Sequence, residues 1–266
     1  MSQGFQRGAQ TIHRALQILD AFALDEPSQT LQQLSTRVRL TVPTTHRILK
    51  ALESREFVMW DPEARKYSLG LGIVRLANVV MRRDNVAAVA QPSLGRLRIL
   101  TGETVGLHWL TGEKRVCVAE EVSRQPIKMA TGIGTIYPLY AGAAGKAMLA
   151  WLEPRQIDRI LSMPLEMGWP SRRPAQEIVA ELEEIRRRGY ALSFGETVPG
   201  ASAIAAPIFN AGGKPVAAIN ITGPAERLTI ARVEEIAEGL LRETHLIMSS
   251  TGASWREGQE SAPEAT

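Results

Sequence analysis

Few side chains in this sequence have the spacing of a catalytic or metal-binding site. The four histidines, His13, His46, His108 and His245, fall on separate predicted elements, and no two of them have the H-x-x-x-H spacing of a zinc site. The single cysteine, Cys117, stands in an apolar stretch, which favours a small buried side chain over a nucleophile. One cysteine excludes an internal disulfide and fits a reducing compartment. We therefore expect no catalytic residue, no metal and no cofactor, in a protein that is not an enzyme.

Three glycine-containing segments each fall short of a known functional motif. Residues 142–147 have the wrong spacing for a phosphate-binding loop, and no Ser or Thr follows the lysine. Residues 132–134 lack the third glycine of a dinucleotide-binding motif, and residues 200–204 lack the second glycine of a nucleophile elbow. The Gly- and Ala-rich loop at 141–145 still has a use, because it would let a small carboxylate approach backbone N–H groups at the start of a helix.

A polar and cationic face is predicted on the helix at 41–54. Apolar periodicity turns Ile48, Leu49 and Leu52 inward together with Thr45, and the opposite face is short-chained at its start and basic further on. Such a face can enter the major groove of DNA. A hairpin at 57–69 would lie along the phosphates as a wing. The residues predicted to contact DNA are Thr30, Thr41, Pro43, Thr44, Thr45, His46, Arg47, Lys50, Arg65 and Lys66.

The charge distribution agrees with this interpretation. Residues 1–83 contain 12 basic and 7 acidic residues, a net charge of +5, whereas residues 84–266 contain 19 and 21, a net charge of −2. A basic front end is typical of a segment that meets a polyanion. An ordinary solvated helix face would have the same charge, so the DNA-binding hypothesis depends on the helices and the hairpin occurring together.

The surrounding elements define the fold class. Helices are predicted at 12–23, at 31–38 and at 71–83, and the buried stripe of the first contains Ile12, Ala15, Leu16, Leu19, Phe22 and Ala23. Later helices, at 145–152, 154–161, 174–188 and 229–249, alternate with strands, and Gly189 is a C-cap signal after the third of them. The 266 residues, 44% of them hydrophobic, allow two domains and exclude wholesale disorder. We predict an α/β (α+β) protein with domains at 9–70 and 85–251, a linker helix at 71–84 and a loose tail at 252–266. No membrane span or export signal is evident, so a cytoplasmic location is expected.

Motifs in both halves resemble one family. They are LQQLS at 31–35, TVPTTHRILKAL at 41–52, YSLGL at 67–71, PLYAGAAGKA at 138–147 and the strand segments between 189 and 224. In this order they resemble the IclR-type transcriptional regulators over roughly residues 10–250. The resemblance implies an N-terminal winged helix-turn-helix and a C-terminal GAF-like effector-binding domain with an antiparallel sheet flanked by helices. It also implies a double-stranded DNA operator, a small-molecule effector and a homodimer that commonly forms a dimer of dimers.

The resemblance also implies an effector site. The matching positions are Leu139, Gly142, Ala143, Ala144, Ser193, Phe194, Ala203, Asn220 and Thr222. Geometry alone leaves Asn220 and Thr222 open, since two residues that share a strand face can bind a ligand or satisfy buried backbone groups. Ala203 and Phe194 depart from the more polar family pattern, which suggests an apolar acid, such as an aromatic one. Glu56 replaces the usual glycine after the recognition helix, so we expect that helix to end differently.

Two other classes remain as alternatives. One is an enzyme or small-molecule-binding protein with an incidental basic front end, and it would need a clustered acid–base pair that the sequence lacks. The other is an architectural DNA binder, which would show little sequence preference and no response to small molecules. The sequence does not distinguish a repressor of a catabolic operon from an activator, although we favour the repressor.

Overall fold

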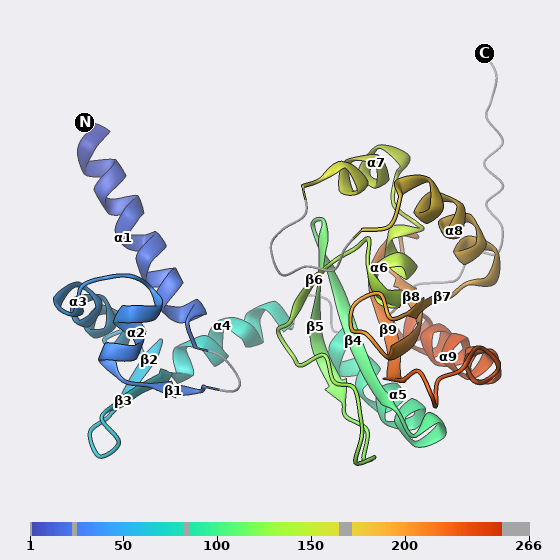
Figure 1. Ribbon diagram of the computed structural model, residues 1–266, viewed down its shortest axis with the longest axis horizontal. Coiled ribbons are helices and arrows are strands. Elements are labelled where there is room, and N and C mark those ends of the chain that lie inside the picture. The colour runs from blue at the N-terminus through green and yellow to red at the C-terminus, as the bar shows by residue number, and fades with distance from the viewer. Residues whose placement is uncertain (1, 23–25, 82–85, 165–171, 252–266) are drawn as a thin grey trace. The chain divides into compact units, whose positions relative to one another are not determined.

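The chain forms two compact units, Met1–Asp84 and Asn85–Thr266, each of which is described by itself (Figure 1). The computed structural model describes residues 2–22, 26–81, 86–164 and 172–251, so the predicted tail at 252–266 lies outside the described residues. Within these ranges, no helix combines the length and the apolar character that a membrane span requires.

The front unit is a bundle of helices with a small antiparallel sheet. Its sheet has the strand order β1-β3-β2, in which the short strand β1 was not predicted from the sequence. The elements are α1 (Ser2–Asp20), β1 (Ser28–Gln29), α2 (Leu31–Arg37), α3 (Val42–Glu53), β2 (Val58–Asp61), β3 (Lys66–Leu69) and α4 (Leu71–Met81). Their shared core contains Ile18, Leu34, Ile48, Leu49, Val58 and Tyr67. The predicted order of helices followed by a hairpin is confirmed.

The predicted buried face of α1 is confirmed at Ala15, Leu19 and Phe22, which pack against the core, and is wrong at Ile12 and Leu16. Ile18 is fully buried, whereas Ile12 and Leu16 are 65% and 54% exposed. The stripe that packs on the core therefore runs through Ile18, with Ala15 and Leu19 partly buried beside it. The sequence pattern was ambiguous because two overlapping apolar stripes exist on this helix, and only the tertiary contacts select one of them.

The chain leaves α3 through a residue in the left-handed conformation, Glu56, although a glutamate is rarely found there. Glu56 has a φ of 60°, so the expectation that Glu would force a different helix end is wrong. The reason lies in the contacts of its carbonyl, which accepts from the Gly72 N–H at 2.8 Å. A Cβ on Gly70 would lie 2.3 Å from the same carbonyl oxygen, so a glycine at position 70 is what allows the chain to pack this closely on Glu56. The Glu56 carboxylate pairs with Arg75.

The back unit is a six-stranded sheet with helices on both faces. All its strand pairs are antiparallel, in the order β6-β5-β4-β9-β8-β7. Its strands are β4 (Thr104–Thr111), β5 (Lys114–Glu121), β6 (Ile136–Pro138), β7 (Ala191–Phe194), β8 (Ala201–Phe209) and β9 (Pro215–Pro224). Its helices are α5 (Val86–Thr101), α6 (Gly142–Leu149), α7 (Pro154–Ser162), α8 (Ala175–Arg188) and α9 (Ile230–Ser250). Figure 1 shows α5 and α9 on one face and α6 on the other. This is the predicted antiparallel sheet flanked by helices.

Strand register determines which side chains face α6. Ser193 pairs with Ala203 and Ala203 with Thr222, while Ala205 pairs with Asn220. Asn220 also pairs with Gly106 on its other side. Because directly paired residues, and residues two apart on one strand, point to the same face of a sheet, these positions form two neighbouring rows on the face beneath α6. Ala203 and Ala205 pack against the α6 core cluster, which identifies the face.

Candidate functional site

The outer face of α3 is exposed, as the sequence pattern indicates. Pro43, His46, Arg47 and Lys50 are exposed, and Thr44 is half-buried. Lys50 Nζ lies 2.8 Å from Glu53 Oε2, and this contact raises the pKa of Lys50. No carboxylate pairs with Arg47 among the residues that the structure describes. The outer face of α3 thus presents Arg47 as a cation without a carboxylate partner among the described residues.

Two of the threonines predicted to contact DNA have structural roles. Thr45 is fully buried and its hydroxyl donates to the Thr41 carbonyl at 3.1 Å, so it belongs to the core and its predicted contact with DNA is wrong. Thr30 forms a capping box at the start of α2, in which its hydroxyl accepts from Gln33 N and donates to Gln33 Oε1. Thr41 remains exposed, with its hydroxyl 2.9 Å from that of Thr44.

The hairpin turn presents Arg65 to solvent. The Asp61 carboxylate accepts from the backbone N–H groups of Glu63 and Ala64, which closes the turn. Arg65 follows with a φ of 52° and is exposed, while Lys66 is half-buried and pairs in register with Asp61. A cation held at the tip of a short hairpin is suited to a phosphate contact.

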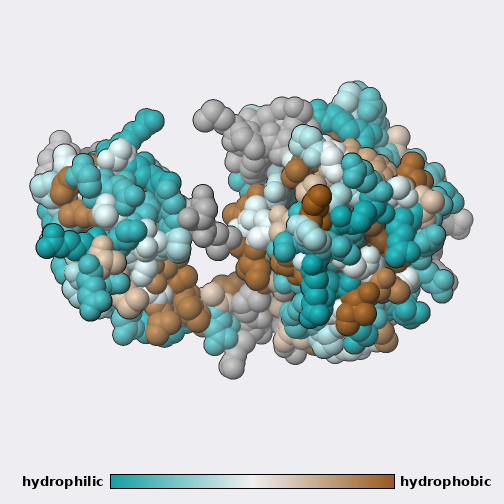
Figure 2. Space-filling model, turned by 60° about the horizontal axis from the view of Figure 1, so that its bottom comes forward, coloured by the Kyte–Doolittle hydropathy of each residue, from teal (hydrophilic) through white to brown (hydrophobic). Residues whose placement is uncertain are grey.

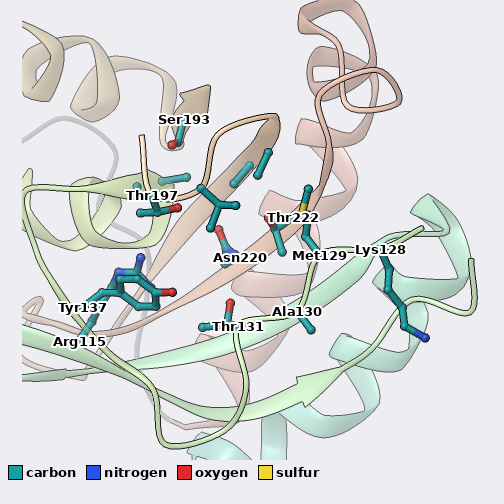
Figure 3. Close-up of a pocket in the computed structure, with 15 residues that line it drawn as sticks. Arg115, Lys128, Met129, Ala130, Thr131, Tyr137, Ser193, Thr197, Asn220 and Thr222 are labelled. Atoms are coloured by element: carbon teal, nitrogen blue, oxygen red, sulfur yellow. The ribbon is translucent and has the colours of Figure 1, made fainter. Parts of the chain in front are cut away.

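A cavity lies in the back unit between α6 and the sheet rows described above (Figure 3). Its volume is about 230 Å³. Small and polar side chains line it, together with two cationic ones. The lining residues are Arg115, Lys128, Met129, Ala130, Thr131, Tyr137, Gly142, Ala143, Ser193, Thr197, Val198, Ala201, Ala203, Asn220 and Thr222. Figure 3 shows the Asn220 amide near the centre, whereas Lys128 extends away from the other side chains.

The cavity brings together most of the effector residues that the resemblance implied. Gly142, Ala143, Ser193, Ala203, Asn220 and Thr222 line it. Leu139, Ala144 and Phe194 do not line it. Leu139 and Ala144 are buried in the cluster around α6. Phe194 is 46% exposed because it follows the inward Ser193 on a strand, and successive side chains point to opposite faces. One of the two reasons for an apolar effector is therefore lost.

Sequence reasoning missed the residues on the β5 side of the cavity. Arg115, Thr131, Tyr137 and Thr197 come from β5, the connection to β6, β6 itself and the loop after β7. Arg115 pairs with Leu110 and Tyr137 pairs with Arg115 across neighbouring strands. Nothing local in the sequence indicates this neighbourhood, since it depends on β6 joining the sheet edge.

Arg115 is the buried cation of the cavity. It is 5% exposed, and its Nη1 donates to His108 Nδ1 at 2.9 Å. Since an arginine only donates, His108 must be neutral with its proton on Nε2. Burial, together with the Arg115 charge, holds the pKa of His108 well below its usual 6.5. Burial likewise lowers the pKa of Arg115 to about 10, which leaves the guanidinium charged at neutral pH.

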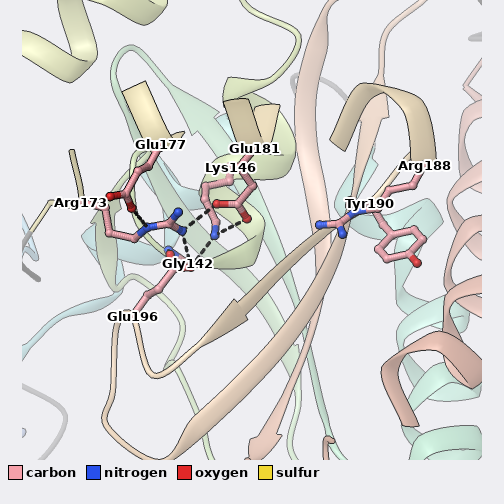
Figure 4. Close-up of polar contacts among 8 residues, drawn as sticks. All are labelled: Gly142, Lys146, Arg173, Glu177, Glu181, Arg188, Tyr190 and Glu196. Atoms are coloured by element: carbon pink, nitrogen blue, oxygen red, sulfur yellow. Dashed lines mark hydrogen bonds and ion pairs between the residues drawn. The ribbon is translucent and has the colours of Figure 1, made fainter. Parts of the chain in front are cut away.

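A second buried cation, Lys146, is fully paired (Figure 4). Lys146 on α6 is 1% exposed and its ammonium contacts the carboxylates of Glu181 and Glu196, with a distance of 2.7 Å to Glu181 Oε1. The second oxygen of Glu196 accepts from the Gly142 N–H at 3.0 Å. The protein's own carboxylate therefore occupies the amide at the start of α6. The expectation that a ligand carboxylate would bind this amide is wrong for Gly142.

The described parts of the chain hold no cluster of three or more histidine, cysteine or acidic side chains that could bind a metal ion. Cys117 is buried, and burial raises the pKa of its thiol to about 12. A protonated, inaccessible thiol is a poor nucleophile.

Comparisons with known proteins give the same family for both units. The family described as IclR helix-turn-helix domain matches residues 11–62, and the one described as Bacterial transcriptional regulator IclR C-terminal matches residues 78–248. The HTH-type transcriptional repressor AllR of Escherichia coli (strain K12) is 32% identical over 244 residues, which cover 90% of this chain and 89% of the relative. The relatives are regulators and not enzymes.

Solved structures agree on the fold. The Thermotoga maritima IclR has a TM-score of 0.75 at 27% identity, with 92% of this chain and 99% of that chain covered. An IclR homologue from Microbacterium hydrocarbonoxydans, solved in complex with 4-hydroxybenzoate, has a TM-score of 0.77 at 22% identity, with 91% and 98% covered.

Proposed function

This chain belongs to the IclR family of bacterial transcriptional regulators, and from that premise we propose that it is a ligand-responsive repressor. It binds operator DNA through α3 and the β2–β3 hairpin, and a small organic acid in the cavity beneath α6 releases it. The regulated genes form a catabolic operon next to its own gene, and the protein acts in the cytoplasm, where that DNA is.

The observation that carries the DNA-binding part is the exposed face of α3. Its first turn presents small and imidazole side chains, and Arg47 and Lys50 follow on the same side. Short side chains let the helix approach the base edges closely, while the cations meet phosphates or guanine. Arg65 at the hairpin tip adds a phosphate contact beyond the helix.

The cavity supports the ligand-responsive part. Asn220 and Thr222 share one strand face and both line the cavity. The Thr222 hydroxyl donates to the Ser202 carbonyl at 3.3 Å, whereas the Asn220 side chain, 6% exposed, points into the cavity (Figure 3). A cavity of about 230 Å³ is smaller than the sites of drug-sized ligands, which favours a small acid.

Dimerisation supplies the second half-site. Along α4 a row of large apolar side chains is exposed, and brown residues gather on this part of the front unit in Figure 2. They are Leu71, Val74, Leu76, Val79 and Val80. An exposed apolar row of this length is typical of a surface that binds a partner, and a second copy of α4 would cover it. The effector then acts by binding one arrangement of the two recognition helices more tightly than the other.

The experiment uses the full chain and a fragment of DNA from upstream of its own gene. A mobility-shift titration should show specific binding that excess unrelated DNA does not compete away, and release on addition of an acid from a panel of small aliphatic and aromatic carboxylates. Asn220→Leu should retain DNA binding and lose the release. Equal competition by unrelated DNA would favour the architectural class, and absence of DNA binding would favour a small-molecule-binding protein.

A further inference from the structure

The guanidinium of Arg115 carries a positive charge that the protein does not neutralise. Among the residues that the structure describes, the hydrogen-bond acceptor of its Nη1 is the neutral ring of His108. The Arg115 Nε is buried without a hydrogen-bond partner. Tyr137 stacks on the guanidinium, with 4.7 Å from Cζ to the ring centroid, but an aromatic face supplies no countercharge.

No carboxylate compensates this charge among the residues that the structure describes. The carboxylate at the start of α6 belongs to Glu196, and its two oxygens are taken by Lys146 and by the Gly142 N–H. Arg173 reinforces the same acidic pair through Glu181 Oε2 at 2.8 Å. The two buried cations of this unit therefore differ: Lys146 has two carboxylates and Arg115 has none.

A buried charge without a countercharge is costly, and natural proteins pair such groups or use them to bind something. Arg115 lines the cavity, so a ligand can reach it. Its planar fork of donors matches a carboxylate, which can accept two parallel hydrogen bonds. Asn220 and Thr222 give the sheet side of the cavity polar but uncharged groups, and the other cation of the lining, Lys128, is exposed.

We propose that Arg115 binds the carboxylate of the effector, which is a small monoanionic acid whose other polar group faces Asn220 and Thr222. This inference deepens the proposed function. It rests on that function only in taking the bound acid to be the effector that releases the DNA. His108 is a positioning residue, because its Nδ1 holds the guanidinium toward the cavity without neutralising it. Glu196 closes the start of α6 to anions, so the carboxylate has one place to bind.

The test compares acids with their own primary amides on the full-length protein. The probes are acetate, propionate, lactate, benzoate and 4-hydroxybenzoate, each beside its amide, at constant ionic strength. Thermal unfolding and isothermal titration should show that at least one acid binds and raises the melting temperature, while its amide binds at least ~30-fold more weakly, as expected for a lost charge-assisted pair. This comparison needs only the wild-type chain.

Two variants locate the anion. Arg115→Met should abolish the stabilisation by that acid, and Arg115→Lys should retain part of it. Lys214→Met is the matched control, because Lys214 is an exposed cation of the same unit that does not line the cavity, so the response to the acid should be unchanged. If no acid in the panel binds, if an amide binds as well as its acid, or if Arg115→Met keeps the response, the proposal is overturned.

DNA binding separates this proposal from the proposed function. Arg115→Met should still shift the upstream fragment, because Arg115 lies in the back unit. Acid binding that depends on Arg115 in a chain without DNA affinity would contradict the regulator and leave the anion site standing. Specific DNA binding without any acid binding would contradict the anion site alone.

Discussion

The neutral His108 should make the back unit sensitive to mild acid. Its ring is fully buried and accepts a hydrogen bond from a cation, so burial and Arg115 both lower its pKa well below 6.5. As the pH falls through 6.5, the unfolded chain binds a proton at this histidine and the folded chain does not. The free energy of unfolding therefore decreases as the pH falls, and the stability from neutral His108 is present only above the ordinary histidine pKa.

The expected loss follows from the linkage slope. One proton taken up only by the unfolded state costs about 1.4 kcal/mol per pH unit, so moving from pH 7.5 to pH 5.0 should cost up to about 2 kcal/mol, nearly all of it below pH 6.5. Glu243, whose pKa the neighbouring Arg96 lowers, contributes only below about pH 4.5, so this window isolates the histidine.

Hydrogen exchange of peptides from β4 and β9, measured in urea at fixed ionic strength, gives the opening free energy where His108 lies. His108→Gln is the control, because its amide does not titrate in this range; the variant should be less stable at pH 7.5 but nearly independent of pH down to 5.0. The reasoning is refuted if the wild type shows no loss, or if His108→Gln shows the same slope as the wild type.

Further predictions concern the start of α6 and of α2. Gly145→Ala should lower the melting temperature and cost about 1–3 kcal/mol of stability, because the new Cβ would lie 2.5 Å from the Leu139 carbonyl oxygen. Gly95→Ala is the control, because no atom lies within 4 Å of its Cβ, and it should be neutral or stabilising. Equal effects of the two substitutions in thermal unfolding would contradict the argument. Thr30→Ala should cost about 1 kcal/mol of stability in urea by removing the capping box, Thr30→Ser should recover it, and DNA affinity per folded molecule should stay within about two-fold. A larger change in DNA affinity would mean that Thr30 contacts the duplex.

Local patterns in the sequence were sufficient for most of the helices and hairpins and for the α3 face, but not for β1, α5 and β6. Periodicity located α3 and turned Ile48 and Leu49 inward, and Gly189 ends α8 with a φ of 82°, as its position after the basic last turn predicts. The same patterns failed where two solutions were locally equivalent. The α1 helix had two possible stripes, and the contact of Gly70 and Gly72 with the Glu56 carbonyl joins residues far apart in the pattern.

The cavity was predictable on one side only. The family resemblance implied Asn220, Thr222 and Ser193, and strand alternation added only that Asn220 and Thr222 share a face. The same alternation, applied to β7, would have placed Phe194 on the face opposite to Ser193. Arg115 needed the pairing of β5 with β6 and the bulge at Leu107/His108, which no local signal indicates. The pairing of Glu196 with Lys146 also joins distant segments, so the blocked amide at Gly142 could not be foreseen.

The contribution of Arg47 to the salt dependence of DNA binding tests the central claim most directly. Arg47 is exposed on α3 without an ionic partner among the described residues, whereas Lys50 shares its charge with Glu53. In titrations of the upstream fragment over a range of salt concentrations, Arg47→Ala should lose at least about 5-fold in affinity, and the slope of log affinity against log salt should fall by about 0.9 for each phosphate contact removed.

Arg187→Ala is the matched control, because it removes the same charge from a side chain on α8 that is 75% exposed. It should leave the affinity and the slope unchanged, and Lys50→Ala should lie between the two. If Arg47→Ala binds like the wild type at every salt concentration, α3 is not the recognition helix and the DNA-binding assignment of this face is contradicted.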